Sequence, residues 1–384
     1  MVLVSVDQHR WELGLERVIR ALDVLGHPER SYPHVLVAGT NGKGSTCMHL
    51  ESIFLEAGMA VGTTMSPHVS RFTERFRIGG RQATVSELKG VRSDILPLVE
   101  DISLTYFEWC VVLASVLFER NKVEAAIFEV GLGGRYDAAN ALDPSVAIIT
   151  NISLDHTDYL GNTIREIALE KSQIARPGRP LVTTAEGEAL EVIRSHADAV
   201  CAQLHEVAGE CMPHTAIPGG LQNRNAALAL EAARLMGIQP SALAVGKAFS
   251  RTFLPGRIEK LGRRIIMDVA HNPSSMLVLV EHLESSGFDG VGVAGILSDK
   301  DYMGIIESLQ KVCRHIFVAP VRSPRSWGEE EMRRAEAAGS VTVCPSVTDA
   351  FFQALSSGVP VVVTGSFYTV GEVRELLVCP GWSS

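Results

Sequence analysis

Val35-Leu-Val-Ala-Gly-Thr-Asn-Gly-Lys-Gly-Ser-Thr46 is the stretch from which the fold of this 384-residue chain can be read. Its four apolar residues predict a buried strand, three glycines interrupt the pattern, and helical spacing resumes from Ser45 to Leu55. In such a strand–loop–helix unit, glycines let backbone N–H groups turn inward and the helix N-terminus adds partial positive charge. Lys43 at the start of the helix can reach terminal phosphates. The stretch therefore predicts a site for a nucleoside triphosphate.

The loop departs from the common G-x-x-x-x-G-K-[ST] pattern at two places. Ala38 stands where an early glycine is usual, and Gly44 separates Lys43 from Ser45. The alternative is a chance Gly-Lys-Gly in a surface turn. The flanking strand and helix favour the phosphate loop, because they lie where its mechanism needs them.

Composition indicates an ordinary soluble protein of two domains. The chain is 46% hydrophobic and 21% charged, and its net charge of −9 argues against a nucleic-acid partner. Met1–Asp7 is too short and too soon charged for a signal peptide, and the longest apolar run, Trp109–Phe118, is about half a membrane span. We therefore expect a cytoplasmic protein with no membrane partner. Its cysteines, with no Cys-x-x-Cys pair, suit reduced thiols; they stand at positions 47, 110, 201, 211, 313, 344 and 379.

Strand-like runs alternate with helical patterns along the chain, as in a parallel sheet covered by helices on both faces. The first part has expected strands at 34–38, 125–130 and 146–150, and expected helices at 13–25, 45–57, 106–120, 164–174 and 223–236. A second alternation has expected strands at 264–269, 291–295, 315–319, 341–344 and 359–364. We expect an α/β fold with a phosphate-loop domain over 1–255 and a smaller Rossmann-like domain over 256–384. The pattern between 190 and 217 is too weak to assign.

Two further loops follow expected strands. Glu129 ends an apolar strand, where a carboxylate is costly unless it is paired or bound to a cation, so it is a candidate magnesium ligand. A buried salt bridge is the alternative. His156 follows another strand, either as a turn histidine or as a metal or phosphate contact, and Lys171 lies on an expected helix, where a solvated charge is usual.

Taken together, the chain resembles the folate branch of the Mur ligase superfamily, dihydrofolate synthase and folylpolyglutamate synthase. The segment Asp101–Glu108 is most similar to the bifunctional bacterial enzymes. The matching motifs follow in order along nearly the whole chain: Leu13-Gly-Leu-Glu-Arg17, the phosphate loop, Ser66-Pro-His68, Asp101–Glu108, Glu129-Val-Gly-Leu-Gly-Gly134, Leu154-Asp-His156, Leu254-Pro-Gly-Arg257, Asp268-Val-Ala-His-Asn-Pro273, Ser298-Asp-Lys-Asp301 and Gly365-Ser-Phe-Tyr368.

The resemblance implies a role for each matching position. The residues that would bind ATP are Gly39, Thr40, Asn41, Gly42, Lys43, Gly44, Ser45, Thr46, Gln222, Asn225, Arg257, Asp268 and His271. Those that would hold Mg²⁺, at two sites, are Ser66, Glu129, His156 and Lys171, the last as a carbamate. Those with catalytic roles are Lys43, Lys171 and His271. Those that would contact the acceptor are Asp137, Phe107 and Arg135. A turn cap is the alternative role of Asp137.

Two departures from the family's pattern concern the acceptor. Leu221 replaces a usual histidine, and Ala139 replaces a threonine beside the implied pterin pocket. The stretch 190–220 is also shorter than the family's. These changes leave the ATP residues intact.

The resemblance implies a monomeric ATP-dependent amide ligase whose active site lies between its domains. It would activate a pterin or other carboxylate as an acyl phosphate and couple it to L-glutamate. Three alternatives remain: the same chemistry on another acid or amine, a phosphate-loop kinase or ATPase, and a non-catalytic nucleotide-binding regulator.

Overall fold

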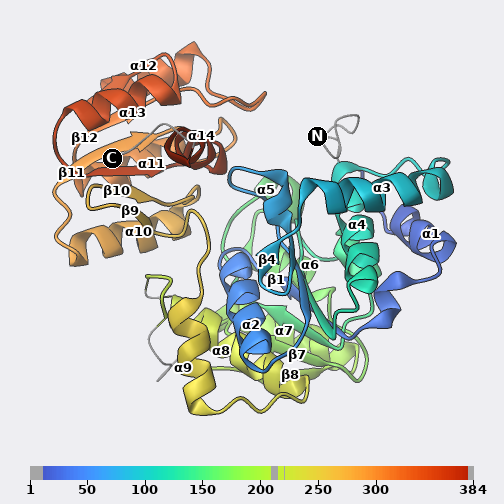
Figure 1. Ribbon diagram of the computed structural model, residues 1–384. Helices are drawn as coiled ribbons and strands as arrows, with labels where there is room; N and C mark the ends of the chain where they lie inside the picture. The colour runs from blue at the N-terminus through green and yellow to red at the C-terminus, as the bar shows by residue number, and fades with distance from the viewer. Residues whose placement is uncertain (1–11, 209–214, 220, 379–384) are drawn as a thin grey trace. The chain divides into compact units, whose positions relative to one another are not determined.

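The computed structural model describes residues 12–208, 215–219 and 221–378. The segment Met1–Asp7, Cys211 and Cys379 lie outside the described residues. Two compact units form (Figure 1): the first comprises residues 1–68, 72–216 and 221–253, and the second 69–71, 217–220 and 254–384. Among the described residues, no helix combines the length and apolar character that a membrane crossing needs.

An eight-stranded sheet forms the first unit, in the order β4-β3-β2-β5-β1-β6-β7-β8. Strands β2 and β5 to β8 run parallel to β1, whereas β3 and β4 form an antiparallel edge. The strands are β1 (His34–Ala38), β2 (Val61–Thr64), β3 (Phe76–Ile78), β4 (Arg81–Gln82), β5 (Ala125–Glu129), β6 (Val146–Ile149), β7 (Pro180–Thr183) and β8 (Gln203–Glu206).

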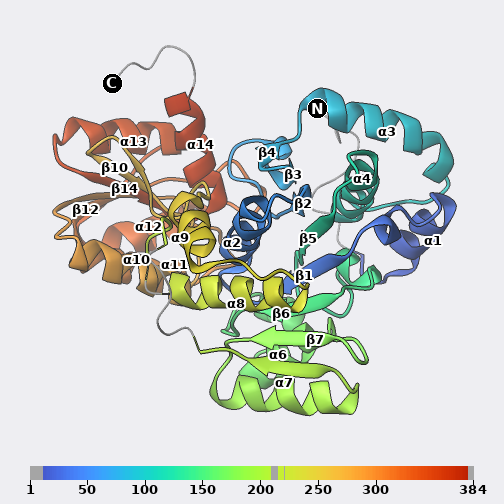
Figure 2. The same cartoon turned by 60° about the horizontal axis from the view of Figure 1, so that its bottom comes forward.

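Helices connect these strands: α1 (Glu16–Val24), α2 (Lys43–Glu56), α3 (Val85–Val99), α4 (Tyr106–Arg120), α5 (Thr157–Leu160), α6 (Ile164–Ser172), α7 (Gly187–Ala199), α8 (Gln222–Leu235) and α9 (Ala242–Arg251). Short 3-10 turns are η1 (Pro28–Ser31), η2 (Phe72–Arg75) and η3 (Ala138–Ala141). Helix α8 lies alongside α2 (Figure 2).

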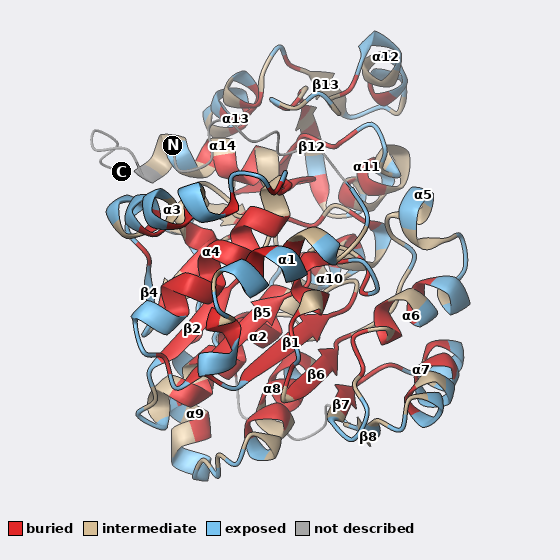
Figure 3. Cartoon of the chain, turned by 90° about the vertical axis from the view of Figure 1, so that its right-hand side faces the viewer, coloured by how far each residue is buried: buried red, intermediate tan, exposed pale blue. Residues whose placement is uncertain are grey.

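Alternation along β1 divides the core of this unit into two layers. Val35 and Val37 pack with α2, α8 and α9, whereas Leu36 and Ala38 pack with α1 and α4 on the other face. The central strands and the inner faces of α2 and α4 are therefore buried, as the red ribbon in Figure 3 shows. Both faces of the sheet are covered, which is why its central strands β1, β5 and β6 are mostly apolar.

A six-stranded sheet in the order β13-β12-β11-β14-β10-β9 forms the second unit, parallel except for β9. Its strands are β9 (Glu259–Leu261), β10 (Ile265–Met267), β11 (Gly290–Ala294), β12 (Cys313–Val318), β13 (Val341–Val343) and β14 (Val361–Thr364). Its helices are α10 (Pro273–Ser285), α11 (Tyr302–Gln310), α12 (Glu329–Ala337), α13 (Val347–Ser356) and α14 (Phe367–Val378).

The α/β fold class with two parallel-dominated sheets is confirmed, and β1, β5, β6 and α4 match their expected ranges within one residue. The unassigned stretch after 190 contains the end of α7 and strand β8, which lie before the first internal gap in the described residues, 209–214. Expected helix 13–25 is shorter than predicted, because α1 begins at Glu16. Five of the seven cysteines are described, and these are free thiols.

Candidate functional site

The predicted phosphate loop spans the four residues between β1 and α2, and two of its glycines are sterically required. Gly39 and Gly42 have φ of +141° and +84°. A Cβ on Gly39 would lie 1.9 Å from Thr150 Oγ1, and one on Gly42 would lie 2.4 Å from Asn225 Oδ1. The loop therefore needs glycine both for its backbone angles and for its closeness to β6 and α8.

Residues that follow β6 hold this loop in place. Asn151 accepts from two successive loop amides, Thr40 N to its backbone oxygen at 2.8 Å and Asn41 N to its Oδ1 at 2.8 Å. The Thr150 hydroxyl donates to Asn41 O at 2.7 Å. Sequence reasoning did not assign Thr150 or Asn151 a role, although two polar residues directly after a buried strand were a signal for it.

The start of α2 has no side-chain cap. Gly42 is the N-cap and provides no side-chain cap, so the N–H groups of the first turn have no partner within the helix. The Thr46 hydroxyl is buried and has no hydrogen-bond partner among the described residues. Uncapped amides and a buried, unsatisfied hydroxyl at a helix N-terminus fit a bound phosphate group.

Two lysines from different elements donate to one backbone oxygen of the loop. Lys43 Nζ lies 3.1 Å from Gly39 O and 3.2 Å from Thr40 O, and Lys171 Nζ lies 3.0 Å from Gly39 O. Lys171 is 4% exposed, so it is not a solvated surface charge. Burial, and next the charge of Lys43, lower the pKa of Lys171 to about 7. Near neutral pH, an appreciable fraction of this amine is therefore uncharged and nucleophilic.

Of the predicted metal ligands, Ser66 and Glu129 meet at the ends of neighbouring strands β2 and β5. Ser66 N donates to Glu129 Oε2 at 2.8 Å, and Glu129 is 6% exposed. His156 caps α5 with a left-handed backbone, and its N–H donates to Asp155 Oδ1 at 2.8 Å. Across the described ranges, no three His, Cys, Asp or Glu side chains cluster in a way that could hold a metal ion. The metal role of these residues stays a prediction.

The predicted acceptor residues Phe107 and Asp137 both contact the glycine loop after β5. A Cβ on Gly131 would lie 2.8 Å from Phe107 Cζ. Asp137 accepts from Leu132 N at 2.9 Å and from Ala139 N at 3.0 Å, and burial raises its pKa to about 6. The capping role of Asp137 is thus present in the structure. Its contact with a pterin stays a prediction.

Among the described residues, the hydrogen bonds of Arg135 go to Glu170 and, through its backbone oxygen, to Asn140 of η3, rather than to Phe107 or Asp137. Its backbone N–H donates to Glu170 Oε1 at 3.1 Å, and its Nε lies 3.5 Å from Glu170 Oε2, toward α6. The Arg135 side chain is 43% exposed. Its role in acceptor binding stays a prediction.

Gln222 and Asn225 lie on the first turn of α8, next to the loop. Asn225 Nδ2 donates to Gln222 Oε1 at 3.2 Å, and Asn225 Oδ1 is the atom that faces Gly42. Leu221, where the family has a histidine, precedes the helix without a side-chain cap. Asn225 is therefore beside the phosphate loop, as a role in nucleotide binding requires, and Gln222 is its hydrogen-bond partner.

Arg257, Asp268 and His271 come together within the second unit. The Arg257 guanidinium lies 5.5 Å from the centroid of the Phe367 ring, and the His271 ring lies 5.7 Å from that centroid. Asp268 accepts from Ile258 N at 2.9 Å and from Ala270 N at 2.8 Å, so it fixes the backbone beside the other two residues.

Arg75 is a buried cation to which sequence reasoning assigned no role. Its Nε donates to His68 Nδ1 at 2.8 Å, and its guanidinium lies 5.4 Å from the Tyr106 ring centroid. It is 8% exposed, and burial together with this guanidinium lowers the pKa of His68 to about 3. The run of polar residues from 65 to 75 was the available signal.

Comparison with known proteins covers both units. Residues 37–203 match the family described as Mur ligase middle domain, and residues 256–367 match that described as Mur ligase, glutamate ligase domain. The dihydrofolate synthase/folylpolyglutamate synthase of Escherichia coli (strain K12) is 36% identical over 389 residues, with 95% of this chain and 92% of that protein covered.

Two solved structures share the fold over almost their entire length. The structure of E. coli FolC in complex with DHPP and ADP superposes with a TM-score of 0.88 at 35% identity, covering 97% of this chain and 95% of that one. A crystal structure of a bifunctional folylpolyglutamate synthase/dihydrofolate synthase with Mn, AMPPNP and L-glutamate bound superposes with a TM-score of 0.86 at 35% identity. The match covers 96% of this chain and 95% of that one. With its phosphate loop and both of its units matched, the chain belongs to the dihydrofolate synthase/folylpolyglutamate synthase family of Mur ligases.

Proposed function

We propose that this protein is an ATP-dependent ligase that joins L-glutamate to the carboxylate of dihydropteroate, a reduced folate, or both. The observation that carries the proposal is the phosphate loop, with Lys43 at the start of an uncapped helix, in a chain similar over nearly its whole length to ligases solved with ADP or AMPPNP. We further propose that it acts in the cytoplasm as a monomer.

In this reaction the acceptor carboxylate attacks the γ-phosphorus of ATP and ADP leaves, which forms an acyl phosphate. The amine of L-glutamate then attacks the acyl carbon and expels phosphate, forming the amide. Lys43 Nζ would move from the loop carbonyls to the terminal phosphates and stabilise the charge that develops there. No covalent intermediate on the protein is needed.

The residues near the loop fit a divalent ion of the Mg²⁺ type. The Glu129 carboxylate and the unsatisfied Thr46 hydroxyl are oxygen donors, which such ions prefer. We propose that Ser66, Glu129, His156 and a carbamoylated Lys171 hold two ions together with the phosphates, whose oxygens would complete a set that the described protein side chains alone do not form. When bound, the ions would neutralise charge on the transferred phosphoryl group.

We assign the remaining residues by what surrounds them. Asn225 lies against the loop, Gln222 is hydrogen-bonded to Asn225, and both would contact the nucleotide. Asp137 and Phe107 would hold a pterin ring through a carboxylate and an aromatic face. Arg257, Asp268 and His271 would complete nucleotide binding from the second unit, whose boundary we place at Pro255.

One assay separates this proposal from its alternatives. ADP release is measured with dihydropteroate and with tetrahydrofolate, each with and without L-glutamate, and Lys43→Ala serves as the inactive control. The ligase predicts release that needs both the acid and the amine. ADP release without glutamate would indicate a kinase or ATPase. If neither dihydropteroate nor tetrahydrofolate supports ADP release, another acid is the substrate.

A further inference from the structure

We propose that Arg17, on the first helix, is a positioning residue that orients Phe107 for the acceptor through the carboxylate of Glu108. The inference rests on the proposed function, because it assigns Phe107 to the acceptor. It adds a residue whose side-chain hydrogen bonds, among the described residues, go to Glu108 and Glu12 rather than to the phosphate loop or the predicted metal ligands.

The Arg17–Glu108 pair joins α1 and α4 through two residues that are 91 positions apart in sequence. Arg17 Nε donates to both carboxylate oxygens of Glu108 at 3.0 Å, and its Nη2 donates to Oε1 at 2.7 Å. The Glu108 side chain is 4% exposed and that of Arg17 is 24% exposed. A guanidinium that donates hydrogen bonds to both oxygens of a buried carboxylate restricts that carboxylate to one orientation.

The same carboxylate completes the N-terminal cap of α4. Thr105 N donates to Glu108 Oε2 at 2.7 Å, and Glu108 N donates to the Thr105 hydroxyl at 3.4 Å. In this capping box Glu108 is the third helical residue, so Tyr106 and Phe107 are the first two. The Glu108 carboxylate therefore fixes the backbone at the start of α4, where Phe107 lies.

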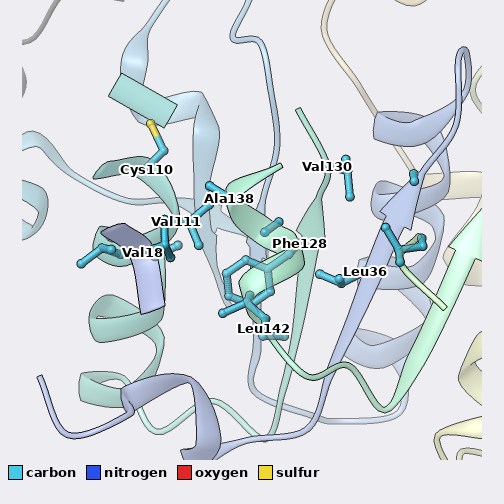
Figure 4. Packing of buried hydrophobic residues seen from close by; sticks show 14 of the residues in the cluster. Val18, Leu36, Cys110, Val111, Phe128, Val130, Ala138 and Leu142 are labelled. Carbon is cyan, nitrogen blue, oxygen red and sulfur yellow. The ribbon is translucent and has the colours of Figure 1, made fainter. Parts of the chain in front are cut away.

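Helix α1 also packs against the elements that carry Phe107 and Asp137. Val18, one residue after Arg17, belongs to a buried cluster with Val111 of α4 and Ala138 of η3 (Figure 4). Asp137 is the N-cap of η3, and Phe107 lies against Gly131. Helix α1 thus supports both elements that carry the proposed acceptor residues, and Arg17 makes its polar connection to one of them.

The chain contains a matched arrangement that bears no site residue. At the start of α3, Glu87 completes a capping box with Thr84 and accepts from Arg81 at 3.0 and 2.6 Å. That pair lies at the surface, with the arginine side chain 53% exposed. Arg81→Met therefore removes the same kind of contact without a connection to Phe107.

The test measures KM for dihydropteroate and for ATP, the Kd of ADP by calorimetry, and the melting temperature. In Arg17→Met we expect KM for dihydropteroate to rise at least tenfold, while KM for ATP and the Kd of ADP stay within twofold. Arg17→Lys keeps the charge and loses the two-pronged contact, so an intermediate KM is expected. Arg81→Met should leave both KM values and the Kd of ADP within twofold of the parent, and the melting temperature within about two degrees.

A double variant keeps the proposal testable if Arg17→Met folds poorly. Glu108→Gln removes the charge that Arg17→Met would leave without its partner, and its amide oxygen can still accept from Thr105 N. Arg17→Met/Glu108→Gln should therefore fold and still show a raised KM for dihydropteroate relative to the parent, with KM for ATP within twofold.

Three outcomes would overturn the proposal. The first is an unchanged acceptor KM in a folded Arg17→Met variant. The second is an equal loss of acceptor and ADP affinity, which would indicate general destabilisation. The third is the same acceptor effect in Arg81→Met. A parent enzyme that turns over no pterin would instead overturn the proposed function, and this inference with it.

Discussion

Lys43 and Lys171 direct their ammonium groups to the carbonyl oxygen of Gly39, and this shared acceptor links the phosphate loop to α6. Burial and, next, the charge of Lys43 raise the cost of charging Lys171, and both lower the pKa of Lys171. A nucleotide that draws Lys43 toward its phosphates would leave Gly39 O to Lys171 alone.

Lys171 is predicted to react with carbon dioxide. Its pKa of about 7 makes the neutral amine abundant at and above neutral pH, and only the neutral amine forms a carbamate. Activity should fall when carbon dioxide is removed from the buffers and return with bicarbonate. Lys171→Ala should be nearly inactive and partly rescued by small carboxylates. A fully active alanine variant would contradict the assignment.

Glu129→Gln tests the metal role, because it removes a charge and keeps the shape. If Glu129 binds Mg²⁺, the variant should need at least tenfold more Mg²⁺ for its half-maximal rate. The measurement is ADP release across an Mg²⁺ titration. Preserved activity with an unchanged titration would favour a purely structural role for Glu129, whose carboxylate already accepts from Ser66 N.

Asp137→Ala separates the two roles of that residue. Loss of the cap should lower the melting temperature, because two backbone N–H groups lose their acceptor. Pterin binding predicts, in addition, a rise in KM for dihydropteroate that far exceeds any change in KM for ATP. A variant that is destabilised but keeps the acceptor KM of the parent would leave Asp137 as a cap only.

The pH dependence of acceptor binding gives a second measurement on Asp137. Its folded pKa is raised to about 6, so the carboxyl is charged above that pH and takes up a proton as the pH falls through it. Only the charged form accepts paired hydrogen bonds from a pterin. In the parent enzyme, KM for dihydropteroate should therefore increase below about pH 6.

At the scale of elements, α2 has a similar glycine just outside each end. Gly42 and Gly58 have φ of +84° and +79°, but a Cβ on Gly42 would meet Asn225, whereas a Cβ on Gly58 would meet nothing within 4 Å. The two positions therefore share the backbone strain of a substitution and differ in the steric clash.

Gly42→Ala should weaken ADP binding at least tenfold, because the loop must move away from α8. Gly58→Ala should cost about 1 kcal/mol of stability from the left-handed backbone and leave ADP binding unchanged. Calorimetry and urea unfolding give the two quantities. Equal ADP affinity in the two variants would mean that the loop tolerates the displacement.

At the scale of the whole molecule, buried histidines make the first unit sensitive to acid. Burial lowers the pKa of His34 and of His49 to about 4 each. The unfolded chain takes up these protons near pH 6.5 and the folded chain does not, so stability falls as the pH drops from about 6.5 to about 4.

His49→Leu tests this contribution, because it removes one of the two groups. The loss of unfolding free energy between pH 7 and pH 5 should be smaller than in the parent by about 2 kcal/mol, measured by urea unfolding at each pH. An equal loss in both proteins would show that His49 titrates normally in the folded chain.

The sequence by itself determined the strand–loop–helix unit around Lys43, the α/β class and the positions of the most apolar elements. Those features follow from the loop's glycines and from local apolar runs, which are unbroken where a strand or helix is buried on all sides, as in β1 and α4. The short strands β2, β7 and β8 were not predicted, because their polar or mixed residues become strand only through pairing with neighbours.

Only the tertiary structure decided which polar side chains are buried and what they contact. A lysine on α6 has the same local sequence whether it faces water or the phosphate loop, and only the packing of α6 buries Lys171 beside Gly39. The contact between Arg17 and Glu108 spans 91 residues, and the capping of the 131–139 loop by Asp137 depends on how that loop folds back. Periodicity carries no information on such contacts, because they depend on distances through space rather than on spacing along the chain.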